Sequence, residues 1–313
     1  MFITLLILAR TFHIASAILI AGTFTFQIVT FGFGRGPVTD GLRDMERSLN
    51  RLAVWILVAA LVSALFWFWL EVVSMTSLSL PGSTSGPTWK TVLFETEFGH
   101  VWQLRLGIAV AALVLTASRL GQNGRPWQLT LPILWLLSVV LLVSLAWISH
   151  AAARGRQPTG LIGDALHLYA AGAWIGALPA LLLCLTRARG SAAVSKIVPR
   201  ALSRFSTLSL CSVGVLIASG ILNSWILVGS IHALFTTDYG RLLLFKLALF
   251  GVLIGLGAQN RLTIKASSAT TSIPPGFLQQ IRGNVIGEIC LGAAVVLIVA
   301  CLGVTAPAQH PQP

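Results

Sequence analysis

Eight long apolar segments constrain this chain more than any other feature of its sequence. Each has about 18 residues or more, enough to cross a bilayer core of roughly 30 Å as a helix. They are residues 2–33, 52–75, 99–120, 129–149, 161–186, 205–230, 240–260 and 283–305. Little remains for a soluble domain, and the chain is 56% apolar and only 10% charged. The sequence therefore predicts an all-α, multi-pass membrane protein with eight transmembrane helices.

The formal net charge of +12 is spread unevenly over the loops. With the N-terminus outside, most basic loop residues lie on the inner side, and the outer side has only Lys90, Arg154, Arg156 and Arg241. The positive-inside rule then places both termini on the outer side of the membrane. The basic character reflects topology, so we expect lipid contacts and no nucleic-acid partner. The first segment has no charged region before it, which favours a retained helix over a cleaved signal peptide.

The two halves of the chain share matched positions. The pattern T-[DE]-[FY]-G-x5-[RK]-L occurs at residues 96–106 and 237–247. Two further sets match at similar offsets: His13, Gly22, Ser63 and Trp69 correspond to His167, Gly176, Ser219 and Trp225. We therefore predict two four-helix repeats, residues 1–150 and 151–313, in the same orientation and related by a pseudo-two-fold axis along the membrane normal.

Imidazole and carboxylate groups gather at the outer ends of the predicted helices. Asp164 and His167 are three residues apart and share a helix face. Such groups are costly at membrane depth unless they bind or pair with something. Neutral imidazole suits copper, zinc, iron and nickel. The candidate metal ligands are His13, His100, His150, Asp164 and His167; alternatively, each is a hydrogen-bonding group without a ligand.

A second set of candidate ligands falls in the inner half of the predicted bundle. It comprises Cys184, Cys211 and Cys290 with Glu288, a possible thiolate station, although buried cysteines are also ordinary small apolar residues. No CxxC pair supports a zinc ribbon or a thioredoxin-type motif.

Other polar groups within the spans are expected to pair helices. Arg10 and Asp164 are matched positions of opposite charge, so a salt bridge between them would let both be buried. Arg105 and Lys246, at matched positions of the repeated pattern, are expected to be structural.

Four stretches carry a resemblance to a known family. GDALHLYAAGAWIGALP at 163–179, HAAARG at 150–155, TDYGRLLLFKLALF at 237–250 and the Arg10-x-x-His13 start resemble the CopD family of bacterial copper-resistance membrane proteins. The resemblance covers essentially the whole chain. It implies an eight-helix inner-membrane protein that works with a small periplasmic copper-binding partner, CopC, and moves copper toward the cytoplasm. We expect that partner to be a separate chain, because no CopC-like domain is fused at either end.

The resemblance also implies particular residues. The ligand candidates that it carries over are His13, His150, Asp164 and His167, with Trp174 and Gly176 shaping the helix.

Three functional hypotheses follow. The first is a copper-handling permease or acceptor. The second is a b-type haem protein with His13 and His167 as axial ligands, in which Gly22 and Gly176 leave room for the flat macrocycle. The third is an assembly or sensing protein that binds no metal. The sequence contains no nucleophile–base set, Walker motif or HExxH, so we expect neither an enzyme nor an ATP-driven transporter.

Overall fold

The computed structural model describes residues 1–32, 40–76, 86–120, 130–148, 158–268 and 276–306. All regular secondary structure in these ranges is helical, and eight helices are long and apolar enough to cross a membrane. This confirms the predicted all-α membrane fold.

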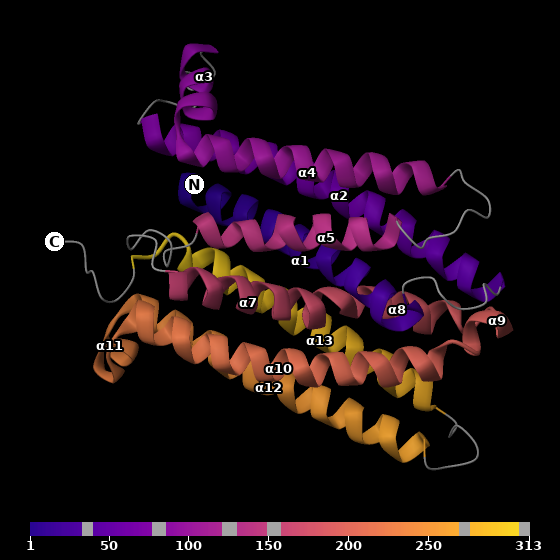
Figure 1. Cartoon of the computed structure of the whole chain (residues 1–313). Helices are drawn as coiled ribbons and strands as arrows, with labels where there is room; N and C mark the ends of the chain where they lie inside the picture. The colour runs from indigo at the N-terminus through magenta and orange to yellow at the C-terminus, as the bar shows by residue number, and fades with distance from the viewer. Residues whose placement is uncertain (33–39, 77–85, 121–129, 149–157, 269–275, 307–313) are drawn as a thin grey trace.

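The helices form an elongated bundle along one common direction (Figure 1). In chain order the elements are α1 (Phe2–Phe31), α2 (Asp40–Thr76), α3 (Gly86–Glu95), α4 (Glu97–Leu120), α5 (Thr130–Val143), η2 (Ser144–Ile148), α7 (Pro158–Trp174), η3 (Ile175–Ala177), α8 (Leu178–Arg187), α9 (Ala192–Ser195), α10 (Val198–Val228), α11 (Ile231–Thr236), α12 (Asp238–Ser268) and α13 (Phe277–Leu302). One end of the bundle carries the N-terminus, α3 and α11, and we call it the outer end; α9 lies at the opposite, inner end.

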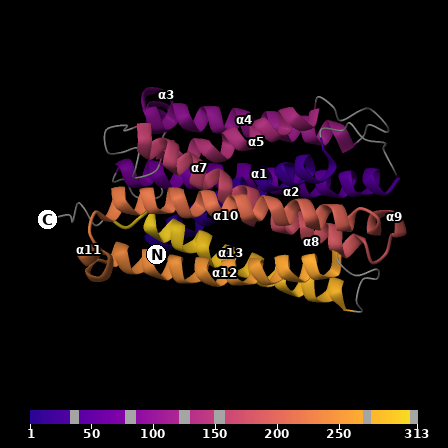
Figure 2. The same ribbon diagram turned by 60° about the horizontal axis from the view of Figure 1, so that its bottom comes forward.

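Helix α1 lies at the centre of the bundle. It is apolar on every side and carries no charged residue after Arg10, which is typical of a helix buried all round. It packs against α2 and α5 of the first half and against α7, η3 and α13 of the second. Helix α12 lies at the edge (Figure 2), where few of its side chains are fully buried and many face the expected lipid.

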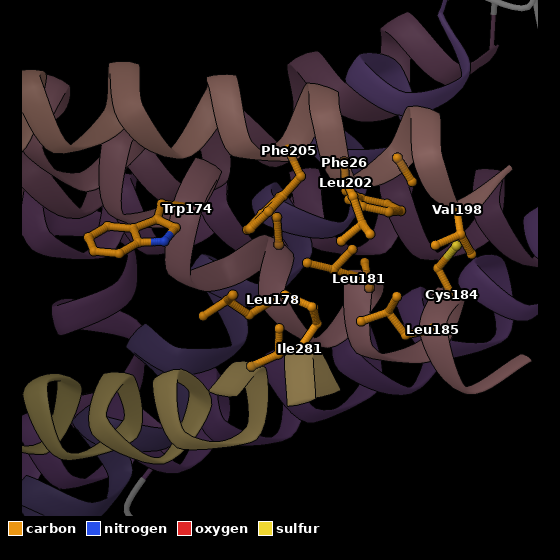
Figure 3. Packing of buried hydrophobic residues seen from close by; sticks show 14 of the residues in the cluster. Phe26, Trp174, Leu178, Leu181, Cys184, Leu185, Val198, Leu202, Phe205 and Ile281 are labelled. Carbon is orange, nitrogen blue, oxygen red and sulfur yellow. The ribbon is translucent and has the colours of Figure 1, made fainter. Parts of the chain in front are cut away.

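The fifth span is broken rather than continuous. Residues 161–186 were expected to form one helix, but α7 ends at Trp174, a 3₁₀ turn follows, and α8 begins at Leu178. Pro179 lies in the first turn of α8, where its missing N–H costs nothing. After the break, Leu178, Leu181 and Leu185 of α8 enter the largest apolar cluster of the bundle (Figure 3).

The repeated T-[DE]-[FY]-G pattern forms the same local structure twice. At the start of α4 the Gly99 N–H donates to Thr96 Oγ1 at 2.9 Å, and at the start of α12 the Gly240 N–H donates to Thr237 Oγ1 at 3.0 Å. A methyl group on either glycine would lie 2.2 Å or 2.4 Å from a carbonyl oxygen of the preceding short helix, α3 or α11. The sequence did not predict those short helices. The pseudo-two-fold relation and the boundary at residue 150 remain predictions, and residues 149–157 lie outside the described ranges.

Candidate functional site

His13 lies deep in the first half of the bundle and is 2% exposed. Its Nδ1 is 3.2 Å from the carbonyl oxygen of Ala60 and 3.3 Å from Ser63 Oγ, both on α2. The Ser63 hydroxyl donates to the same Ala60 carbonyl at 3.1 Å, so both neighbours of Nδ1 act as acceptors. We therefore assign the ring proton to Nδ1 and the lone pair to Nε2.

Arg105 donates a hydrogen bond to the Nε2 lone pair of His13. Its Nη2 lies 2.6 Å from His13 Nε2, while Nη1 donates to the Leu141 carbonyl at 2.8 Å and to Ser144 Oγ. The Arg105 side chain is 1% exposed. Both imidazole nitrogens of His13 are thus engaged, and neither is available to a metal in this arrangement.

Aromatic rings enclose this histidine. The ring centroids of Trp67 and Trp102 lie 5.4 Å and 5.3 Å from that of His13. Trp67 Nε1 also donates to Glu71 Oε1 at 2.8 Å. The cluster is a packed core region and not an opening.

The predicted salt bridge between Arg10 and Asp164 is wrong. Arg10 Nη1 pairs with Glu71 Oε1 at 3.6 Å, and its guanidinium lies 5.0 Å from the Trp67 ring centroid. Helices α1 and α2 pack side by side, and this packing brings Glu71 of α2, rather than Asp164 of α7, to the guanidinium of Arg10.

His167 repeats the arrangement of His13 in the second half, with one difference. Its Nδ1 is 3.0 Å from Ser219 Oγ, and the Ser219 hydroxyl donates to the Val215 carbonyl at 2.6 Å. The imidazole must then donate from Nδ1, which leaves the lone pair on Nε2. No residue in the described ranges forms a hydrogen bond with this Nε2.

Asp164 lies one turn before His167 on the same face of α7. Its Oδ1 accepts a hydrogen bond from Asn223 Nδ2 at 3.0 Å. Asn223 and Ser219 are four residues apart on α10, so one face of α10 holds both the carboxylate and the imidazole.

A cavity of about 630 Å³ opens beside these residues in the outer half of the bundle. It lies between α1, α7, α10, α12 and α13 and is mostly apolar. Lys246 of α12 is close enough to both Asp164 and His167 to interact with them electrostatically. The charged and polar side chains that line the cavity include Arg10, Asp164, His167, Asn223, Ser224, Ser230, Tyr239 and Lys246.

The other predicted ligands do not join this pair in the described structure. His100 is exposed, and its Nε2 lies 3.0 Å from the Phe94 carbonyl at the end of α3. His150 lies outside the described ranges. Among the residues that the structure describes, no group of three or more histidine, cysteine or acidic side chains is arranged to hold a metal ion. Of the four candidates that the structure describes, only Asp164 and His167 share an accessible site.

The candidate inner station is likewise not assembled within the described ranges. Cys184 is buried in the apolar cluster around α8, whereas Cys211 and Cys290 are exposed. Glu288 is hydrogen-bonded to Asn260 and lies in a separate polar cluster.

The geometry does not fit haem ligation by His13 and His167. Gly22 and Gly176 bring α1 and η3 into direct backbone contact: a methyl group on Gly22 would lie 2.0 Å from the Gly176 carbonyl carbon. The space expected for a macrocycle is therefore filled by the neighbouring helix, and Arg105 already occupies His13 Nε2.

Sequence reasoning missed the residues that orient the site. Ser219 was noted only as a matched position, and Asn223 and Glu71 received no role. Each is a polar side chain on an apolar helix, and this feature of the sequence could have indicated a role. The partner of each, however, depends on how the helices pack.

Comparisons with known proteins agree over both halves of the chain. A family model described as copper resistance protein D-like, N-terminal domain, matches residues 1–158, and a model described as copper resistance protein D matches residues 199–302. The copper resistance protein D of Pseudomonas syringae pv. tomato is 32% identical over 228 residues, covering 71% of this chain and 72% of that protein.

Two further relatives differ in how much of their own length this chain covers. The copper transport protein CutJ of Bacillus subtilis (strain 168) is 31% identical over 213 residues, which are 67% of this chain but only 37% of that protein. The inner membrane protein YebZ of Escherichia coli (strain K12) is 26% identical over 296 residues, covering 91% of this chain and 95% of that protein. No solved structure matches the chain.

Proposed function

Because the chain belongs to the copper resistance protein D family, a family of copper-related membrane proteins, we propose that it takes up copper at the outer end of the bundle through His167 and Asp164. The proposal is for binding and transfer, without catalysis. The basic inner loops support an orientation in which the outer end faces the periplasm.

The observation that carries this proposal is the hydrogen bonding of His167. Because Ser219 fixes the proton on Nδ1, the Nε2 lone pair remains free in a residue that lines the outer cavity. An imidazole held by its other nitrogen in this way is a prepared metal ligand. Asp164 adds an anionic oxygen on the same face of α7, and water or a further donor would complete the coordination of the ion.

The positive charge of Lys246 favours a site for transfer over one for storage. At an effective dielectric constant of about 20, two unit charges about 4 Å apart interact by about 4 kcal/mol, so an ammonium group lining the cavity opposes the binding of a cation there. Asp164 offsets part of that repulsion. The net effect is a weak site from which copper can leave, as transfer requires.

Movement across the membrane would proceed within the second half of the protein. A second cavity lies in the inner half, between α7, α8, α10, α12 and α13, and one aromatic residue from the lining of each cavity forms a ring pair. Trp174 lines the inner cavity and Phe250 the outer one, with ring centroids 6.3 Å apart. Copper that crosses by this route requires these two rings to separate.

We further propose that a separate periplasmic copper-binding protein of the CopC type delivers the metal. The cavity lies in the outer half of the bundle, and its lining continues to Ser230 and Gly303, next to the outer ends of α11 and α13. A donor that docks at this end would therefore release copper close to Asp164 and His167.

The direct test is copper and iron content of the detergent-purified protein, measured in one elemental analysis after expression with both metals supplied. His167→Ala should reduce bound copper at least several-fold. His100→Ala is the matched control, because that side chain is exposed and contacts only the end of α3. Full copper occupancy in His167→Ala would contradict the proposed site, and stoichiometric iron would contradict the copper assignment itself.

A further inference from the structure

The inner cavity contains a buried acidic side chain that forms no ion pair with any basic residue in the described part of the chain. The cavity measures about 130 Å³, and Glu288 in its lining is 2% exposed. The other ionisable side chain in this lining is Arg261, whose Nη1 donates to the Ser206 carbonyl at 3.1 Å and to Ser206 Oγ at 3.0 Å. In the described ranges no basic side chain forms an ion pair with Glu288.

A chain of amide groups holds the Glu288 carboxyl in place. Asn260 Nδ2 donates to Glu288 Oε1, and Asn284 Nδ2 donates to Asn260 Oδ1 at 2.8 Å. These amides come from α12 and α13, so the polar chain joins the two helices at the inner end. The amide donor of Asn260 already occupies Oε1, and no second histidine, cysteine or acidic pair completes a metal site in the described residues.

Trp174 provides a second observation, because its indole N–H is a potential donor to the Glu288 carboxyl after that group loses its proton. Its side chain is 1% exposed, and its indole N–H has no hydrogen-bond partner among the described residues. The same residue lines the cavity, and its indole N–H faces the Glu288 carboxyl without the geometry of a formed hydrogen bond. A buried, unpaired N–H beside a carboxyl is a donor ready for a charged oxygen.

Glu71 provides a contrast, because this carboxyl has a cationic partner. It also faces an indole N–H, that of Trp67 at 2.8 Å, but it has the guanidinium of Arg10 at 3.6 Å as counter-ion. Glu288 has an amide in place of that guanidinium. Burying an unpaired carboxylate at membrane depth is costly, whereas a protonated carboxyl in the same place is neutral.

We propose that Glu288 is a proton-binding site that exchanges protons with the inner end of the bundle through the inner cavity. In the protonated state the carboxyl is neutral and keeps its hydrogen bond from Asn260. When the proton leaves through the cavity, the Trp174 N–H is placed to donate to the carboxylate that forms. This site is separate from the proposed copper site, and it stands or falls independently of copper binding.

The test is infrared difference spectroscopy of the full-length protein in lipid nanodiscs, without copper, between neutral and alkaline buffer. The wild-type protein should show the carbonyl-stretch band of a protonated carboxylic acid at neutral pH, and the band should disappear at alkaline pH. Glu288→Gln should lose the band, because the amide keeps the shape and the Asn260 contact but cannot bind the proton. Glu288→Asp, which retains a carboxyl, should keep a band at a shifted position.

Glu71→Gln is the matched control, since Glu71 is paired with Arg10 and should contribute no protonated band. Absence of the band from the wild-type protein, or its survival in Glu288→Gln, would overturn the proposal. Loss of the band in Glu288→Gln and Glu288→Asp alike would show that it reports the fold and not this carboxyl, which would overturn the proposal as well.

Discussion

Replacement of Gly22 by alanine should separate the two halves of the bundle at their closest contact. The added methyl group would lie 2.0 Å from the carbonyl carbon of Gly176 and 2.3 Å from the nitrogen of Ala177. Ordinary van der Waals contact begins at 3.4 Å. Because both opposing atoms belong to the backbone, no side chain can rotate away, and α1 must move from η3 by about 1.4 Å (3.4 minus 2.0).

The expected cost is large for a single methyl group. Over-packing of a well-packed core typically costs about 1–3 kcal/mol. Here the displaced element is the central helix, which contacts both halves, so we expect ~3 kcal/mol or more. At roughly 2 °C per kcal/mol for a chain of this size, the midpoint of thermal unfolding in detergent should fall by at least ~5 °C.

Gly107→Ala and Gly251→Ala are the matched controls. Neither glycine has an atom within 4 Å of the added methyl group, and alanine is the better helix former, so both variants should unfold at or slightly above the wild-type temperature. Equal unfolding temperatures for Gly22→Ala and Gly107→Ala would refute the reasoning. Such a result would also restore the idea that Gly22 borders open space.

Three further predictions concern the groups around the two histidines. Arg105→Met should destabilise the protein by ~3 kcal/mol or more in thermal unfolding, because it leaves His13 Nε2 unpaired in the core and removes the hydrogen bonds to the Leu141 carbonyl and Ser144 Oγ; a change below ~1 kcal/mol would contradict this. Lys246→Arg should lower copper content in elemental analysis by placing a guanidinium where it can cap the free imidazole nitrogen, whereas Lys246→Gln should raise it; the opposite order would count against the proposed role of this charge. Asn223→Leu should weaken copper binding in a competition titration, because it removes the hydrogen bond that positions the Asp164 carboxylate, and unchanged affinity would make that bond irrelevant to the site.

Sequence reasoning predicted the features that depend on composition and local pattern. Hydropathy gave all eight spans because a bilayer requires long apolar helices, whatever their packing. The repeated T-[DE]-[FY]-G pattern was found by matching the two halves of the sequence, and it forms the same local hydrogen bond at the starts of α4 and α12. The break after Trp174 also had a local signal, since Pro179 lies close by, but the sequence reading continued the helix through it.

The remaining features depend on packing between helices, which a single sequence does not encode in any simple pattern. Arg10 could have paired with either of two acidic side chains at similar depth, and the contact between α1 and α2 decides for Glu71. The outer histidines were grouped because they share one side of the membrane. In the structure, His13 and His167 each face the helices of their own half, so a shared depth did not mean a shared site.

The contrast between the two halves explains why one of them is the candidate for metal binding. Each half holds a histidine by a hydrogen bond from Nδ1 to a serine whose own proton goes to the backbone, so both rings present the same lone pair. In the first half a rigid guanidinium with several donors takes that lone pair and ties α1 to α5. At the matched position of the second half, lysine is a flexible point charge that lines the cavity without capping the ring. The exchange of arginine for lysine therefore accompanies the difference between an engaged histidine on α1 and one that lines the cavity on α7, which is why the proposed copper site is on α7.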